Sequence, residues 1–323
     1  MTRHAENPLG CLRSMRRWRS RPVVKLAALA LFVQALPAPP VYAQQFGDWS
    51  PAVSVDPGGV IGVNTAVNEG CPMESPDGGT LFFASNRQST ANDIWVSVRA
   101  GEEDPWGTPV RLPTPVNSAT ANDFCPTPLP GNRLLFVSTR NSLCGGVNSA
   151  DIYFTGQHPV QGWLEPRHLG CNVNSAFEEF SPSLVEAEGL TMLFFSSNRL
   201  GTHDIFVSLL QDDGSWSPAE PVAELNSPFQ DARPNVRKDG LEVVFDSTRD
   251  EGMPELYIAT RSSVFDPWSQ AQRLGPNVNA TGAAETRASF SRDGTRLYFG
   301  SNRGPGQGSN DIYVSTRAGR GKD

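Results

Sequence analysis

Five acidic residues recur at equivalent positions along this 323-residue chain and are the first candidates for chemistry. Each follows an asparagine by five or six residues and precedes the proline of a short extended segment by three, Ala288 replacing that proline in the last case. The five are Glu69, Asp123, Glu179, Asp231 and Glu285, and the asparagines are Asn64, Asn117, Asn174, Asn226 and Asn279. A ring of such carboxylates could bind a cation, a basic peptide segment or a hydroxyl-rich ligand. Alternatively, each carboxylate accepts backbone N–H groups or pairs with a repeated arginine, which would be a structural role.

The position two residues after each carboxylate breaks this repetition. It holds Cys71, Cys125, Ser181, Arg233 and Arg287, so only the last two units add a guanidinium group. Arg233 and Arg287 could receive a ligand carboxylate or sugar acid in bidentate fashion, or they could neutralise the acidic ring. We therefore predict a ligand site formed by the five carboxylates together with Arg233 and Arg287.

Other catalytic arrangements find little support. The three histidines after the N-terminal segment, His158, His168 and His203, show no metal-ligand spacing with the cysteines, and we expect neither a metal nor a cofactor. Glycoside hydrolysis requires two carboxyl groups in different environments, which five equivalent positions do not provide. Binding is therefore favoured over a glycan-active hydrolase or lyase, and whether the protein is an enzyme remains open.

The elements that carry these residues form a fivefold repeat. The arginines of five Ser-x-Arg sequences, Arg87, Arg140, Arg199, Arg249 and Arg303, are 53, 59, 50 and 54 residues apart. Each follows a short apolar run such as 81–83 (LFF) and precedes an Asp-Ile-Tyr-type segment such as 311–315 (DIYVS). Units of this size that each contain four strands predict an all-β fold, a five-bladed β-propeller spanning residues 44–318. We expect each arginine to pair with the acidic residue across its hairpin: Asp93, Asp151, Asp204, Glu255 and Asp311.

Tryptophans suggest how the ring closes. Trp106, Trp163, Trp216 and Trp268 open the fourth strand of units one to four, whereas the last unit ends at Arg317 without one. Trp49 stands alone near the N-terminus. We predict that an N-terminal strand completes the C-terminal blade, which removes an open sheet edge.

Four cysteines follow the N-terminal segment. Cys144 and Cys171 fall in connections that leave the same face of the second blade, so we predict that they form a disulfide. Cys71 and Cys125 occupy equivalent positions on adjacent inner strands, where either a disulfide or two buried thiols would fit. Three connectivities are formally open.

Residues 1–43 resemble an export signal. Basic residues precede an apolar run at 26–36, and 41–43 (VYA) fits a cleavage site. Removing this segment leaves 20 basic and 33 acidic residues, a formal charge near −13, which excludes a nucleic-acid partner. We expect a monomer with no transmembrane segment, located in the periplasm or secreted, and a disordered tail at 319–323.

The repeat itself points to a family. Residues 75–87 (SPDGGTLFFASNR) with 92–96 (NDIWV), and 291–299 (SRDGTRLYF), resemble the WD-like propeller repeat of periplasmic TolB-type proteins. We expect no separate N-terminal domain of the TolB kind before Trp49 and no peptidoglycan-binding domain after Arg317. The resemblance implies a stand-alone propeller that binds an envelope protein segment or a glycan at the mouth of its central channel.

Overall fold

The computed structural model describes residues 46–147, 149–250 and 252–319, so the export signal expected at 1–43 and residues 320–323 of the expected tail lie outside them. Regular structure in this part of the chain is almost entirely β, with one 3-10 turn, η1 (Pro57–Gly59). None of the described helices is long and apolar enough to cross a membrane.

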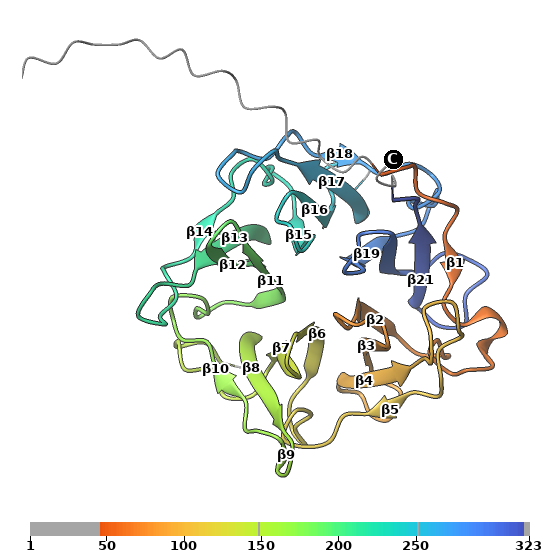
Figure 1. The fold of residues 1–323 in the computed structure, drawn as a ribbon, viewed down its shortest axis with the longest axis horizontal. Coiled ribbons are helices and arrows are strands. Elements are labelled where there is room, and N and C mark those ends of the chain that lie inside the picture. The colour runs from red at the N-terminus through yellow and green to blue at the C-terminus, as the bar shows by residue number, and fades with distance from the viewer. Residues whose placement is uncertain (1–45, 148, 251, 320–323) are drawn as a thin grey trace, which may run out of the picture. The chain divides into compact units, whose positions relative to one another are not determined.

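Five antiparallel sheets surround a central channel, which confirms the predicted five-bladed propeller (Figure 1). The strands nearest the channel are β2 (Glu69–Glu74), β6 (Asp123–Leu129), β11 (Glu179–Ala187), β15 (Asp231–Val236) and β19 (Glu285–Phe290). The second strands are β3 (Thr80–Ser85), β7 (Arg133–Ser138), β12 (Leu190–Ser197), β16 (Glu242–Ser247) and β20 (Arg296–Ser301). The third strands are β4 (Asp93–Val98), β8 (Asp151–His158), β13 (Asp204–Leu209), β17 (Glu255–Thr260) and β21 (Asp311–Thr316). The outer strands are β5 (Val110–Arg111), β10 (Arg167–His168), β14 (Glu220–Pro221), β18 (Gln272–Arg273) and β1 (Val53–Ser54).

The second strands form the centre of the hydrophobic core. Their side chains are apolar on both faces because each lies between two neighbouring blades. One cluster, for example, joins Ile94 and Leu112 of the first blade to Leu134, Phe136 and Tyr153 of the second. Burial of this kind fixes the blades against one another and thereby the inner strands around the channel.

The last blade contains residues from both ends of the described chain. Strand β1 pairs with β21, with Val53 opposite Val314 and Ser54 opposite Tyr313. Upstream of β1, Trp49 stacks on Phe290 at 6.3 Å between ring centroids. We expect this pairing to stabilise the ring, because it covers the edge of β21.

The second blade departs from the common pattern. Strand β8 has eight residues where β4, β13, β17 and β21 have six, and its extension pairs with an additional short strand, β9 (Gly162–Trp163). The predicted disulfide between Cys144 and Cys171 is present in this blade. A second disulfide joins Cys71 to Cys125, the pair for which the sequence left two alternatives open.

Candidate functional site: the channel and its mouth

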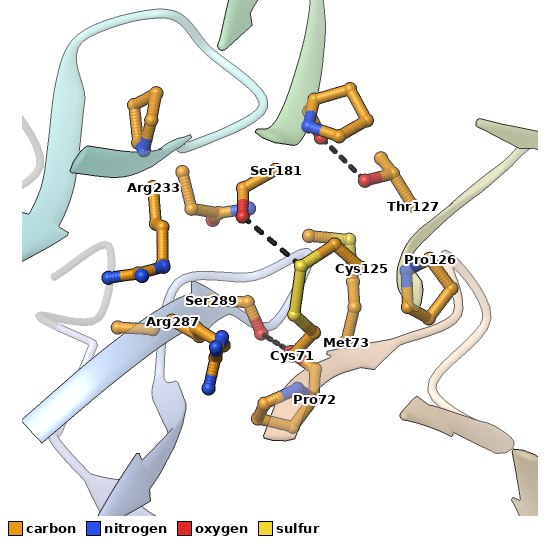
Figure 2. Close-up of a pocket in the computed structure, with 14 residues that line it drawn as sticks. Cys71, Pro72, Met73, Cys125, Pro126, Thr127, Ser181, Arg233, Arg287 and Ser289 are labelled. Atoms are coloured by element: carbon orange, nitrogen blue, oxygen red, sulfur yellow. Dashed lines mark hydrogen bonds between the residues drawn. A yellow bond between two sulfur atoms is a disulfide. The ribbon is translucent and has the colours of Figure 1, made fainter. Parts of the chain in front are cut away.

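All five inner strands contain the same irregularity where they face the channel. In β15, for example, the pairing with β16 shifts between Ala232 and Asn235. The residue within each bulge has a left-handed φ of 45° to 58°, at Cys71, Cys125, Ser181, Arg233 and Arg287. Such a conformation costs of order 1–3 kcal/mol for a residue other than glycine and persists where the surrounding structure imposes it. Bulges redirect side chains, and these five residues all line the central cavity (Figure 2).

The channel is narrow at this level. Its central cavity measures about 20 Å³, room for roughly one water molecule. The Cys71–Cys125 disulfide lies there, and Ser181 Oγ donates a hydrogen bond to Cys125 Sγ at 3.4 Å. Arg233 and Arg287 reach the same cavity from blades four and five, and Arg287 lies against Gly70 of β2, one of the two strands that the disulfide joins (Figure 2). The central cavity is therefore too small for a ligand larger than water.

The five repeated carboxylates are fully buried and none lines this cavity. Each pairs with the Ser-x-Arg arginine of its own blade: Glu69 with Arg87 at 3.3 Å, Asp123 with Arg140 at 2.7 Å, Glu179 with Arg199 at 2.9 Å, Glu285 with Arg303 at 2.9 Å, and Asp231 with Arg249. Burial raises the pKa of Asp123, Glu179 and Glu285. These contacts match the structural alternative, and a ligand role for the five carboxylates stays a prediction.

The expected pairing of these arginines across each hairpin is wrong. Asp93 instead receives two hydrogen bonds from Arg111 on the outer strand, at 2.7 Å each, and Glu255 pairs with Arg273 in the same way. The Ser-x-Arg arginine pairs with the inner-strand carboxylate because the serine orients the arginine side chain. In every blade the arginine Nε donates a hydrogen bond to that serine Oγ at 2.8–3.0 Å.

The repeated asparagines also have a structural role. Asn117, for example, accepts from the backbone N–H of Ile94 at 2.7 Å and donates to the same residue's carbonyl at 2.9 Å. Ile94 belongs to the third strand of the preceding blade, and the other four asparagines make the same pair of bonds. Each asparagine therefore fastens its inner-strand loop to the neighbouring blade.

The channel-facing arginines differ from these repeated pairs. Arg233 Nη1 donates to Asp246 Oδ2 at 2.6 Å, and the backbone N–H of Arg287 donates to Asp246 Oδ1 at 3.0 Å. Burial raises the pKa of Asp246, against the opposing influence of Arg233. The guanidinium of Arg287 makes no hydrogen bond or ion pair with any described residue, although Gly70 of the first blade leaves room for it. Burial, followed by the charge of Arg233, lowers the pKa of Arg287 to about 10, so this side chain is cationic at neutral pH.

Further unsatisfied polar atoms lie near these arginines. His203 stacks on Phe180 with ring centroids 5.0 Å apart, and its buried Nδ1 has no hydrogen-bond partner in the described part of the chain. Burial and then Arg233 lower the pKa of His203. Thr286 Oγ1, on the residue before Arg287, is also buried without a described partner.

Loops at the carboxylate end of blades three and four carry exposed apolar side chains. Phe177 and Phe229 are each about half exposed, and Leu200 and Met253 lie in the loops after the arginines of the same two blades. We call these four residues the apolar rim. They add hydrophobic contact area to the end of the molecule at which Arg233 lies.

Two residues important to this site were missed from the sequence. Asp246 occupies a position where the other blades have Ala84, Val137, Ser196 and Gly300, so aligning the repeats would have shown one acid among small or apolar residues. His203 precedes Asp204 where the other units have asparagine, alanine or proline. Both are departures from the repeat, as Arg233 and Arg287 are.

Comparison with known proteins supports the fold. A scan of protein-family models found no match, and a search of curated proteins found none. Among solved structures, the α-L-arabinofuranosidase of Podospora anserina in complex with cellotriose is 13% identical, with a TM-score of 0.54 over 84% of this chain and 97% of that chain. The catalytic domain of an α-L-arabinofuranosidase from Coprinopsis cinerea is 13% identical, with a TM-score of 0.53 over 84% and 98%. A putative TolB from Agrobacterium tumefaciens is 18% identical, with a TM-score of 0.45 over 72% and 69%. These likenesses concern the propeller fold alone.

Proposed function

We propose that this protein is an exported binding protein that recognises a carboxylate group, on a protein segment or an acidic glycan, at the mouth of the channel. The observation that carries the proposal is the Arg287 guanidinium, which is partly buried and has no hydrogen bond or ion pair to a described residue, since Arg287 bonds to Asp246 through its backbone N–H. The arginines of the repeated pairs, by contrast, all have carboxylate partners.

A partly buried arginine whose guanidinium lacks a hydrogen-bond partner lowers the stability of the ligand-free protein. A cation removed from water loses hydration energy, and here the nearest carboxylate, Asp246, forms its ion pair with Arg233 and offsets only part of that loss for Arg287. The lowered pKa of Arg287 reflects the same imbalance. A bound carboxylate would supply two parallel hydrogen bonds and the missing charge, so the energy lost on folding would be recovered on binding.

The neighbourhood restricts the ligand. Arg233 already forms an ion pair with Asp246, so we expect Arg287 to be the primary contact of the ligand carboxylate. Arg233 adds a second positive charge beside it. The apolar rim suits a ligand that also presents hydrophobic groups, such as a peptide segment with an acidic residue or a free C-terminus. An acidic sugar would use the arginines and fewer of the rim residues.

The cysteines agree with an exported protein. Two disulfides are present in the described residues, and disulfides persist mainly in oxidising compartments. Together with the leader sequence expected at 1–43, they support the proposal that the protein acts in the periplasm or outside the cell.

A glycan-active enzyme is the second candidate, because two propellers with TM-scores above 0.5 are arabinofuranosidases. Against it, the repeated carboxylates are buried in arginine pairs, whereas a hydrolase needs an acid and a second carboxyl group on either side of the scissile bond. Release of reducing sugar from arabinan by the wild-type protein would favour this candidate.

The decisive comparison is between Arg287→Ala and Arg249→Ala. We expect Arg287→Ala to unfold at the same temperature as the wild type or higher, and to lose binding of carboxylates measured by calorimetry. Suitable probes are galacturonate oligomers and short peptides with free, amidated or acidic ends. Arg249→Ala should instead lower the free energy of unfolding by about 3 kcal/mol, since it leaves Asp231 buried and unpaired.

Two results would contradict the proposal. One is equal affinity of wild type and Arg287→Ala for every carboxylate that binds. The other is a loss of stability in Arg287→Ala as large as that in Arg249→Ala, which would make Arg287 a structural residue. Arg292→Ala, at the opposite end of the inner strands, is the control for loss of a positive charge.

A further inference from the structure

The tryptophans that precede the outer strands are covered by arginine in three of the five blades. The Arg99 guanidinium lies 4.2 Å from the ring centroid of Trp106, Arg261 lies 4.1 Å from Trp268, and Arg317 lies 4.3 Å from Trp49. In each case the arginine stands six residues after the first residue of the third strand. A cation over an aromatic face is a stabilising contact and also shields that face.

In the second blade the covering arginine is replaced. Its equivalent is Gln157, and no guanidinium of the described residues lies over the ring of Trp163. Trp163 is only partly buried, whereas Trp106 and Trp268 are buried. The extra strand β9 contains Trp163 and pairs it with Gln157. The position of the Trp163 ring therefore depends on the strand that distinguishes this blade from the others.

Trp163 lines a groove between the first and second blades. The groove has a volume of about 320 Å³, within the usual range of small-molecule sites, about 300–1,000 Å³. Phe82 adds a second, partly exposed ring, and the hairpins around Asp77 and Asn132 form its sides. The side-chain amides of Gln157 and Asn132 are exposed, and neither forms a hydrogen bond with another described residue.

We propose that this groove is a second binding site, for a neutral saccharide. The apolar C–H face of a sugar ring can stack on an uncovered indole, and its hydroxyl groups can both donate to and accept from planar amides. Gln157 and Asn132 supply such amides beside the Trp163 ring. The one arginine in the lining, Arg133, is matched by one acid, Asp77, so the groove has no net charge that would select an ionic ligand.

The groove is distinct from the channel mouth. In β6 the carboxylate Asp123 pairs with the last residue of β7, and the hairpin that contributes Asn132 joins the opposite ends of the same two strands. The same holds for Glu69 and the hairpin that contains Asp77. The two sites therefore lie at opposite ends of the inner strands, and each can be tested without disturbing the other.

The test uses protein labelled with 5-fluorotryptophan, in which each tryptophan gives its own ¹⁹F resonance. The Trp163 signal is assigned from Trp163→Phe. Cello-, xylo- and chito-tetraose are then titrated to millimolar concentration, with a proline-rich peptide as the competing ligand class, because Pro76, Pro128 and Pro130 also line the groove. We expect at least one tetrasaccharide to shift the Trp163 signal in a saturable manner, with no shift from the peptide.

The sharpest variant is Gln157→Arg. It restores the residue found in blades one, four and five, so the new guanidinium should cover Trp163 and weaken saccharide binding by about tenfold or more, while the melting temperature stays equal or rises. Arg287→Ala and Trp216→Phe should bind the saccharide as the wild type does. The proposal is overturned if no tetrasaccharide shifts the Trp163 signal, if only the peptide does, or if Gln157→Arg folds and binds with full affinity.

Discussion

Arg233 Nη1 and Asp246 Oδ2 are 2.6 Å apart, in an ion pair that the repeat does not predict. Asp246 stands where the other blades have small or apolar residues, and its side chain is almost completely buried. Both oxygens are used, since the second accepts the backbone N–H of Arg287. The carboxylate therefore holds both channel-facing arginines in place, one through its side chain and one through its backbone.

Asp246→Asn tests how much the Asp246 carboxylate contributes to the free energy of unfolding. Removing the negative charge leaves two cations close together in a partly buried site, so we expect the free energy of unfolding to fall by about 3 kcal/mol. Urea unfolding of Asp246→Asn, Arg233→Gln and the double variant measures the coupling between the two residues. Additive effects in this cycle would mean that the ion pair contributes nothing beyond its separate parts.

Glu74 and Glu102 both form an ion pair with Arg296, one buried and one exposed. Arg296 lies 3.0 Å from Glu74 and 3.3 Å from Glu102, but the Glu74 side chain is 1% exposed and that of Glu102 is 58% exposed. Glu74 also accepts from Arg99 at 2.8 Å and from the Tyr298 hydroxyl at 2.6 Å, which links the first blade to the last. We expect Glu74→Gln to lower the free energy of unfolding by about 3–5 kcal/mol and Glu102→Gln by less than about 1 kcal/mol.

Chemical denaturation of these two variants and the wild type measures the two differences in the free energy of unfolding. If both differences are small, the favourable interactions of the buried Glu74 cluster are offset by the cost of removing its charges from water.

The repeat made the fold predictable, and departures from the repeat made part of the site predictable. Period, apolar runs and turn residues recur five times, so an error in one unit is corrected by the other four. Arg233 and Arg287 were found because they break a column of the repeat, and Asp246 could have been found in the same way. The arginine pairing failed because each repeat has one carboxylate at the start of its inner strand and another at the start of its third strand. Only three-dimensional geometry shows that the serine directs the Ser-x-Arg side chain to the inner-strand carboxylate.

His203 should make stability depend on pH. Its pKa in the folded protein is lowered, chiefly by burial, so between the unfolded value of about 6.5 and the lower folded value the unfolded chain binds more protons. Stability from this residue is therefore fully present above about pH 6.5 and is lost as the pH falls through the folded pKa, with a slope of at most about 1.4 kcal/mol per pH unit. Thermal unfolding across this range should show a shallower decline for His203→Gln than for wild type.

His158→Gln is the control for this measurement, because His158 is exposed and should leave the wild-type slope unchanged. An identical slope in His203→Gln and the wild type would assign the acid sensitivity to other groups.

The pairing of β1 with β21 predicts that the N-terminal strand is needed for cooperative folding. A chain that begins at Gly58 lacks β1, Phe46 and Trp49, so β21 becomes an open edge and Arg317 loses two aromatic partners. Two backbone-anchoring contacts to the preceding loop are lost as well, from Asn277 Nδ2 to the Trp49 carbonyl at 2.7 Å and from the Ala52 N–H to the Asn277 carbonyl at 2.9 Å. We expect a broad thermal transition at lower temperature instead of a single cooperative one, because the last blade would separate from the rest. A chain that begins at Gln44 is the control and should retain a sharp transition in calorimetry. Equal melting temperatures and equal cooperativity in the two chains would show that the ring is held together without this strand.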